Sequence, residues 1–145
     1  MFAKPRNGWT DILLGDFEGL GSYIQDVPVE AMDACIRALK NGTPLELHFD
    51  EEGSEFTLTA DETIKIVAQG YYGPEEYEVK ISRMELIQQI LEDMEEFFED
   101  WVEWPEEYAY FEDDEAEAKQ AFYDERVILL NGLLKEFKEE LEKAK

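Results

Sequence analysis

The chain has 145 residues, a length that suits a single domain over residues 1–145. Its hydrophobic content of 44% and aromatic content of 13% are enough to form a core, which excludes a disordered acidic tail. The 37 acidic and 13 basic residues give a net charge of -24. Such a charge disfavours direct binding to nucleic acid or to an anionic membrane surface.

The number of cysteines and the hydropathy of the chain indicate the cellular compartment in which the protein is expected. The chain has one cysteine, Cys35, so an intramolecular disulfide is excluded. No apolar stretch typical of a signal peptide follows the first basic residues, and no apolar run reaches the length of a transmembrane helix. We therefore expect a cytoplasmic protein.

The first 42 residues predict a short strand and a helix. Residues 11–14 favour a strand, and the three glycines that follow, within residues 15–21, indicate a loop or a bulged strand. Pro28 suits the first turn of a helix, which we expect over residues 28–40 and which Asn41 and Gly42 would end. One apolar face of this helix is formed by Met32, Cys35, Ile36 and Leu39.

Residues 45–81 have the period of an antiparallel sheet that is covered on one side. Apolar and polar residues alternate over 45–50, 55–60, 64–69 and 77–81. Turn residues separate these runs at 51–53, 61–62 and 70–74. The segment therefore predicts four successive strands.

Two long helices are expected after the strands. Ser82 and Glu85 form a capping-box pattern, and the apolar stripe that follows continues to Trp101, before Pro105 ends the helix. A second helix is expected to start after Asp113 and Asp114. We thus predict an α+β fold, with an antiparallel sheet of three to five strands packed by one short and two long helices.

Charge and aromatic residues gather around the connection between these helices. Residues 84–118 contain fifteen acids and no basic residue, and acids and aromatics interleave over residues 101–111. Aromatics are favoured as binding anchors, and acids speed the encounter with a cationic partner. The predicted partner-binding residues are Glu96, Glu99, Asp100, Glu103, Trp104, Glu106, Glu107, Tyr108, Tyr110, Asp113 and Asp114.

The same segment also fits a solvated acidic face whose aromatics only cap the core. Trp101 continues the apolar stripe, so we expect it in the core. Trp104, Tyr108 and Tyr110 are the aromatics expected at the surface.

Other candidate chemistry has weak support. Cys35 is expected on an apolar helix face and His48, the only histidine, on the polar side of a strand, so they do not predict a catalytic dyad. Residues 112–115 are better explained as a helix N-terminus than as a cation site, and residues 19–21 lack the pattern of a phosphate loop. We predict no catalytic, cofactor-binding or metal-binding residues, and no enzyme.

In size, acidity and the aromatic segment 97–115, the chain resembles small acidic immunity proteins of polymorphic and contact-dependent bacterial toxin systems. The resemblance is one of type. It implies a bacterial inhibitor that occludes the active site of a basic toxin, such as a nuclease.

Three other functions remain open. A DNA-mimic inhibitor of a nucleic-acid-binding protein would place its acids in two strips, whereas the clustering here favours one patch. An enzyme or small-ligand domain would need a pocket, for which only residues 15–21 are suggestive. A scaffold subunit would use the apolar seam of residues 123–141 as a helix partner.

Overall fold

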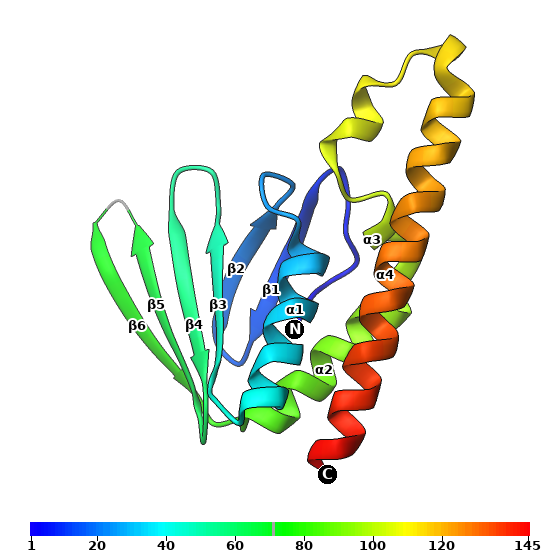
Figure 1. Cartoon of the computed structure of the whole chain (residues 1–145). Coiled ribbons are helices and arrows are strands. Elements are labelled where there is room, and N and C mark those ends of the chain that lie inside the picture. The colour runs from blue at the N-terminus through cyan, green and yellow to red at the C-terminus, as the bar shows by residue number, and fades with distance from the viewer. Residues whose placement is uncertain (71) are drawn as a thin grey trace.

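The computed structural model describes residues 1–70 and 72–145 and has the predicted α+β fold (Figure 1). A two-stranded hairpin consists of β1 (Trp9–Leu14) and β2 (Phe17–Ser22). A four-stranded antiparallel sheet has the order β3 (Leu45–Asp50), β4 (Glu55–Ala60), β5 (Ile64–Gly70) and β6 (Gly73–Val79). The helices are α1 (Val27–Asn41), α2 (Arg83–Glu96), α3 (Phe98–Val102) and α4 (Ala116–Ala144), with 3-10 turns η1 (Glu106–Tyr110) and η2 (Asp113–Glu115).

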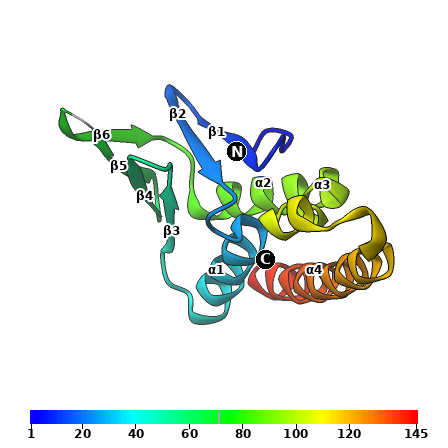
Figure 2. The ribbon, with the colours of Figure 1, turned by 90° about the horizontal axis from the view of Figure 1, so that it is seen from above.

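The predicted sheet meander is confirmed, because β3 to β6 pair in sequence order. The last strand begins earlier than expected, at Gly73, so the loop predicted over residues 70–74 is shorter. Tyr71, which belongs to that loop, lies outside the described residues. The apolar face is covered by the hairpin and the helices, and the opposite face is left open (Figure 2).

The loop or bulged strand predicted over residues 15–21 is instead the turn of the hairpin and a regular strand, β2. The hairpin packs on the apolar face of the sheet, where the ring of Phe17 lies 4.9 Å from that of Phe56 and 5.0 Å from that of Tyr77. A Cβ at Gly19 would lie 2.7 Å from the Phe56 ring. Gly19 is therefore a close-packing residue and not a loop residue.

The first helix agrees with its prediction. Pro28 lies in its first turn, and Gly42 ends it in a left-handed conformation with φ 62° and donates its N–H to Ala38 O. Figure 1 shows α1 beside α4, and Lys40 Nζ lies 2.6 Å from Glu136 Oε1 across this contact. The predicted N-cap of α2 is also present, since the Glu85 N–H donates to Ser82 Oγ at 3.3 Å.

The prediction of one continuous helix up to Pro105 is wrong. The helix breaks at Phe97, which has φ -105° and ψ 29°, and the short α3 follows. Trp101 spans the break, because its Nε1 donates to Asp93 O at 3.1 Å while its ring contacts Phe2 at 5.6 Å. Neither proline nor glycine occurs at the break, so the local sequence carries no signal for it.

The last helix, α4, has 29 residues and starts after the acidic pair that predicted its beginning. Its buried residues are Arg126, Leu130, Leu134, Phe137 and Leu141. The part before Arg126 therefore has no fully buried residue, although Phe122 and Tyr123 are half-buried, and it extends beyond the rest of the fold (Figure 1). Within the described residues, no helix has the length and apolar character needed to cross a membrane.

Candidate functional site

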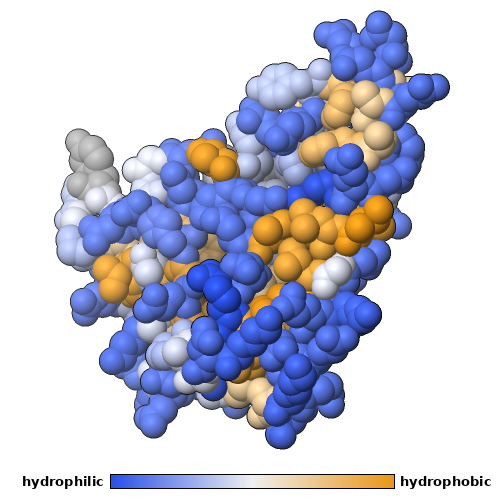
Figure 3. Space-filling view, in the orientation of Figure 1, coloured by the Kyte–Doolittle hydropathy of each residue, from blue (hydrophilic) through white to orange (hydrophobic). Residues whose placement is uncertain are grey.

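The most distinctive surface is a projecting segment, residues 103–125, which we call the acidic arm. It contains η1, η2 and the first ten residues of α4. The arm carries ten acids and a single basic residue, Lys119, and all ten acids are exposed. Figure 3 shows mostly hydrophilic atoms at this end of the molecule, around a smaller apolar area. The arm is therefore a concentrated source of negative potential.

A small aromatic cluster holds the two sides of the arm together. The ring of Phe122 on α4 lies 5.0 Å from that of Tyr108 and 5.9 Å from that of Phe111. At the tip, the Glu112 N–H donates to Glu115 Oε1 at 3.1 Å in a capping box before α4. The prediction that these tip acids mark a helix N-terminus is confirmed. The arm thus has its own local packing, and it reaches the main core through the buried Trp104 and the half-buried Tyr123.

Arg126 anchors the base of the arm and is only 5% exposed. Its guanidinium donates to Trp101 O at 2.9 Å and to Val102 O at 3.3 Å, the carbonyls at the C-terminal end of α3. It also donates to Asp26 Oδ2 at 2.7 Å, in the loop before α1. One buried cation therefore joins α3, α4 and the β2–α1 loop and satisfies orphan helix carbonyls.

A cleft of about 400 Å³ separates the base of the arm from the turn before β1. Its lining residues are Asn7, Gly8, Tyr23, Glu103, Trp104, Pro105, Glu106, Tyr108 and Ala109. Gly8 has φ 79°, and a Cβ there would lie 2.5 Å from Tyr23 Cδ1, so the glycine allows the Tyr23 ring to pack against the backbone. Tyr23, Trp104 and Tyr108 are the aromatic residues of its walls, and Glu103 and Glu106 on its lining are exposed.

Near the cleft, two buried polar atoms lack a hydrogen-bond partner among the residues that the structure describes. They are the hydroxyl of Tyr108 and Oδ1 of Asp26. Desolvation raises the pKa of Tyr108 to about 12, although the nearby Arg126 cation acts in the opposite direction. Asp26 and Arg126 also line an adjoining hollow of about 280 Å³, together with Phe122. The two hollows share Tyr23, Trp104 and Pro105, and only the second one borders the ion pair.

The structure brings eight of the eleven predicted residues into the arm. Glu96 is the last residue of α2, and Glu99 and Asp100 lie on α3, so these three fall outside it. All the predicted acids are exposed except Asp100, which is half-buried. Tyr110 is 70% exposed and donates its hydroxyl to Glu106 Oε1 at 2.6 Å.

The prediction that Trp104 lies at the surface is wrong. It is 3% exposed, its ring lies 5.4 Å from that of Trp101, and its Nε1 donates to Gln25 O at 2.8 Å. The core therefore continues past the end of α3, where the sequence suggested a loop. Trp101 is in the core as predicted, and Tyr108 is half-buried by its contact with Phe122.

Sequence reasoning missed Arg126, Asp26, Tyr23 and Phe122. A signal existed only for Arg126, which lies four residues before Leu130 on the stripe of buried positions and so occupies an apolar site. Tyr23 and Asp26 reach the arm from a distant segment, and Phe122 meets Tyr108 across the arm itself.

The two other candidate residues, Cys35 and His48, lie in different environments. Cys35 lies in the core as predicted, and burial raises the pKa of its thiol. His48 is exposed on β3, with Nδ1 3.1 Å from Thr57 Oγ1 and Nε2 3.5 Å from Glu55 Oε2. In the part of the chain that is described, no group of three or more histidine, cysteine or acidic side chains could hold a metal ion.

Comparison of the chain with protein-family profiles, with curated proteins and with solved structures gives no match. The arm, the cleft and the other surfaces of this fold are therefore the features that indicate its function.

Proposed function

We propose that the protein is a stoichiometric inhibitor that binds a basic protein through the acidic arm, as an immunity protein binds its cognate bacterial toxin. The observation that carries the proposal is the concentration of ten exposed acids and one lysine on a projecting segment. The fold gains little from this segment, and the repulsion among its charges is unfavourable. A cationic partner would relieve that repulsion.

The cleft at the base of the arm supports the same proposal. Tyr23 and Tyr108 offer aromatic faces, and Glu106 offers a carboxylate beside them. A lysine or arginine side chain suits such walls through cation–π attraction and charge pairing. The arm would then accelerate association, and the cleft would hold one cationic anchor residue of the partner.

A nuclease-type toxin is the partner class that fits this chemistry best. Enzymes that bind nucleic acid present lysine and arginine to phosphates, so carboxylates on the arm would occupy the same positions. A DNA-mimic inhibitor of another nucleic-acid-binding protein remains the second candidate. The two differ in their target, because the mimic would compete with duplex DNA for a binding protein that has no catalytic activity to block.

The test requires the partner, which is captured from an extract of the source organism on the immobilised chain and identified by mass spectrometry. In the arm variant, Glu103, Glu106 and Glu107 are replaced by lysine. The matched control replaces Glu62, Glu76 and Glu78, which are also exposed but lie in and beside the sheet. Both variants carry the same net charge.

We expect the arm variant to associate at least about tenfold more slowly at low salt, with a reversed salt dependence, as measured by stopped-flow fluorescence. The control variant should lose only the smaller contribution of net charge. Titration of the partner's activity should reach full inhibition at one equivalent. Equal slowing by both variants, or no slowing, would contradict the assignment of the arm.

A further inference from the structure

A second surface lies at the edge of the four-stranded sheet, away from the arm. β3 is an edge strand, and it pairs with β4 on one side only. Leu47 lies opposite Leu58, and the Glu51 N–H donates to Ser54 O in the turn that follows. This register places the hydrogen bonds to β4 on the odd-numbered residues, so the backbone groups of Glu46, His48 and Asp50 point away from the sheet.

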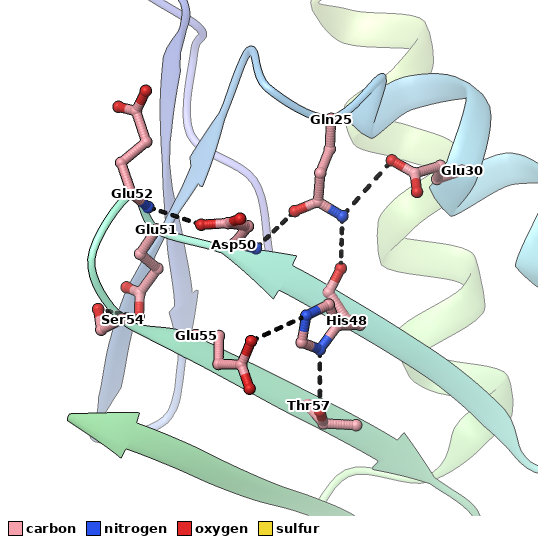
Figure 4. Close-up of polar contacts among 9 residues, drawn as sticks. All are labelled: Gln25, Glu30, His48, Asp50, Glu51, Glu52, Ser54, Glu55 and Thr57. Atoms are coloured by element: carbon pink, nitrogen blue, oxygen red, sulfur yellow. Dashed lines mark hydrogen bonds and ion pairs between the residues drawn. The ribbon is translucent and has the colours of Figure 1, made fainter.

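Gln25 already occupies part of this edge (Figure 4). Its Nε2 donates to His48 O at 2.9 Å, and its Oε1 accepts the Asp50 N–H at 2.5 Å. A residue of a neighbouring parallel strand would bond to the same two groups, spaced two residues apart. The side-chain amide thus takes the place of one residue of a fifth strand.

An equivalent pair, one carbonyl and one N–H, lies two residues earlier along β3. The carbonyl of Glu46 and the N–H of His48 have no hydrogen-bond partner among the described residues. They border a groove of about 240 Å³ between β3 and α1, whose floor includes Val27, Ala31 and Leu47. A second hollow of about 180 Å³ shares Glu46 with this groove and extends it towards the start of β3.

The charge of the groove indicates what it would accept. Asp33 is paired with Arg37 at 3.0 Å, but Glu30 and Glu46 have no cationic partner among the described residues. Glu30 is partly desolvated, which raises the pKa of its carboxyl group, although Gln25 donates to it at 3.5 Å. Two unpaired carboxylates on the walls therefore favour a ligand with positive charge.

We propose that an extended basic peptide segment of a partner protein adds to β3 at residues 46–48 and lies in the groove beside α1. Its backbone bonds to Glu46 O and the His48 N–H, and its lysine or arginine side chains lie near Glu30 and Glu46. Strand addition at an edge takes its affinity from main-chain hydrogen bonds and its selectivity from the side-chain positions beside the edge. The proposal does not depend on the arm.

The test uses the ¹⁵N-labelled protein and the peptide acetyl-Val-Lys-Val-Lys-Val-amide as the probe. Two peptides serve as controls: the same sequence with every backbone nitrogen methylated, and a version with glutamate in place of lysine. We expect the probe to shift the amide signals of Glu46 and His48 and to slow hydrogen exchange of the His48 N–H. Both control peptides should bind at least about tenfold more weakly.

A matched pair of variants tests the same hydrogen bond from the protein side. His48→Ala keeps the edge N–H, whereas His48→Pro removes it at a position where edge strands tolerate proline. We expect the first variant to bind the probe like the wild type and the second to lose about tenfold in affinity.

Three outcomes would overturn the proposal: equal binding of the methylated peptide, shifts confined to the arm, or no shift at millimolar probe. The peptide controls decide the matter even if His48→Pro does not fold. Shifts confined to the arm would overturn strand addition and leave the proposed arm function standing.

Discussion

The two halves of α4, before and after Arg126, contribute differently to the fold. From Arg126 onward the helix buries five side chains, and its basic residues other than Lys135 are paired, as in Lys138 with Glu95 at 2.9 Å and Lys143 with Glu140 at 3.0 Å. In the ten residues before Arg126 the same helix has no fully buried residue, and Lys119, its one basic residue, has no ion pair in the described part of the chain. Packing therefore explains the sequence of the second half, whereas the acids of the first half need another reason.

The two halves also differ in how they are held. The second half lies against α1 and α2, and its apolar stripe belongs to the main core. The first half is held mainly by the Phe122 cluster and by the half-buried Tyr123, and the buried Arg126 marks the boundary. Local opening of the arm should therefore cost far less than global unfolding.

The largest expected effect comes from a pair of matched substitutions on this helix. Phe137→Ala removes a fully buried ring and should lower the free energy of unfolding by about 3–5 kcal/mol. Phe122→Ala should lower it by about 1 kcal/mol or less, because the cluster is partly exposed. Urea unfolding measures both values, and hydrogen exchange should report faster exchange in the arm alone for Phe122→Ala. Similar losses for the two variants would make the arm part of the cooperative core.

A smaller loss is expected at the boundary between the halves. Arg126→Met leaves two carbonyls of α3 and the Asp26 carboxylate without their donor, so the free energy of unfolding should fall by about 3 kcal/mol. Lys135→Met, an exposed position on the same helix, is the control and should change it by less than about 0.5 kcal/mol. If the two variants are equally stable, the guanidinium does not anchor the arm.

The smallest effect at neutral pH is expected for Tyr108→Phe, because the buried hydroxyl that it removes has no hydrogen-bond partner in the described part of the chain. Desolvation raises the pKa of Tyr108 from 10.0 to about 12, so the folded state holds this proton more tightly than the unfolded state. The wild type should therefore lose stability as the pH rises from about 10 through about 12, and Tyr108→Phe should lose less.

Denaturant unfolding at several alkaline pH values checks this loss, and absorbance at 295 nm locates the titration. Tyr110→Phe is the control, since its exposed hydroxyl should matter little for stability. A Tyr108 titration centred near pH 10 would show that its ring is solvated and the arm less tightly packed.

Much of the fold was predictable because its signals are local. The alternation along β3 to β6, Pro28 and Gly42 at the ends of α1, and the serine cap of α2 act over a few residues. The core position of Trp101 also followed from a helical stripe that survives the break at Phe97. For the candidate site, composition identified the acidic segment, and the structure added that eight of the eleven predicted residues lie on a projecting arm.

The sequence by itself determined the periodicity of the strands and helices, the core faces that follow from it, and the place where negative charge concentrates. Only the tertiary structure decided that Trp104 is buried against Gln25, that Arg126 reaches Asp26, and that Gln25 closes part of the β3 edge. These contacts join residues 79, 100 and 23 positions apart. Periodicity is set by neighbours along the chain, whereas a hydrogen bond across such a separation depends on how the completed layers pack together.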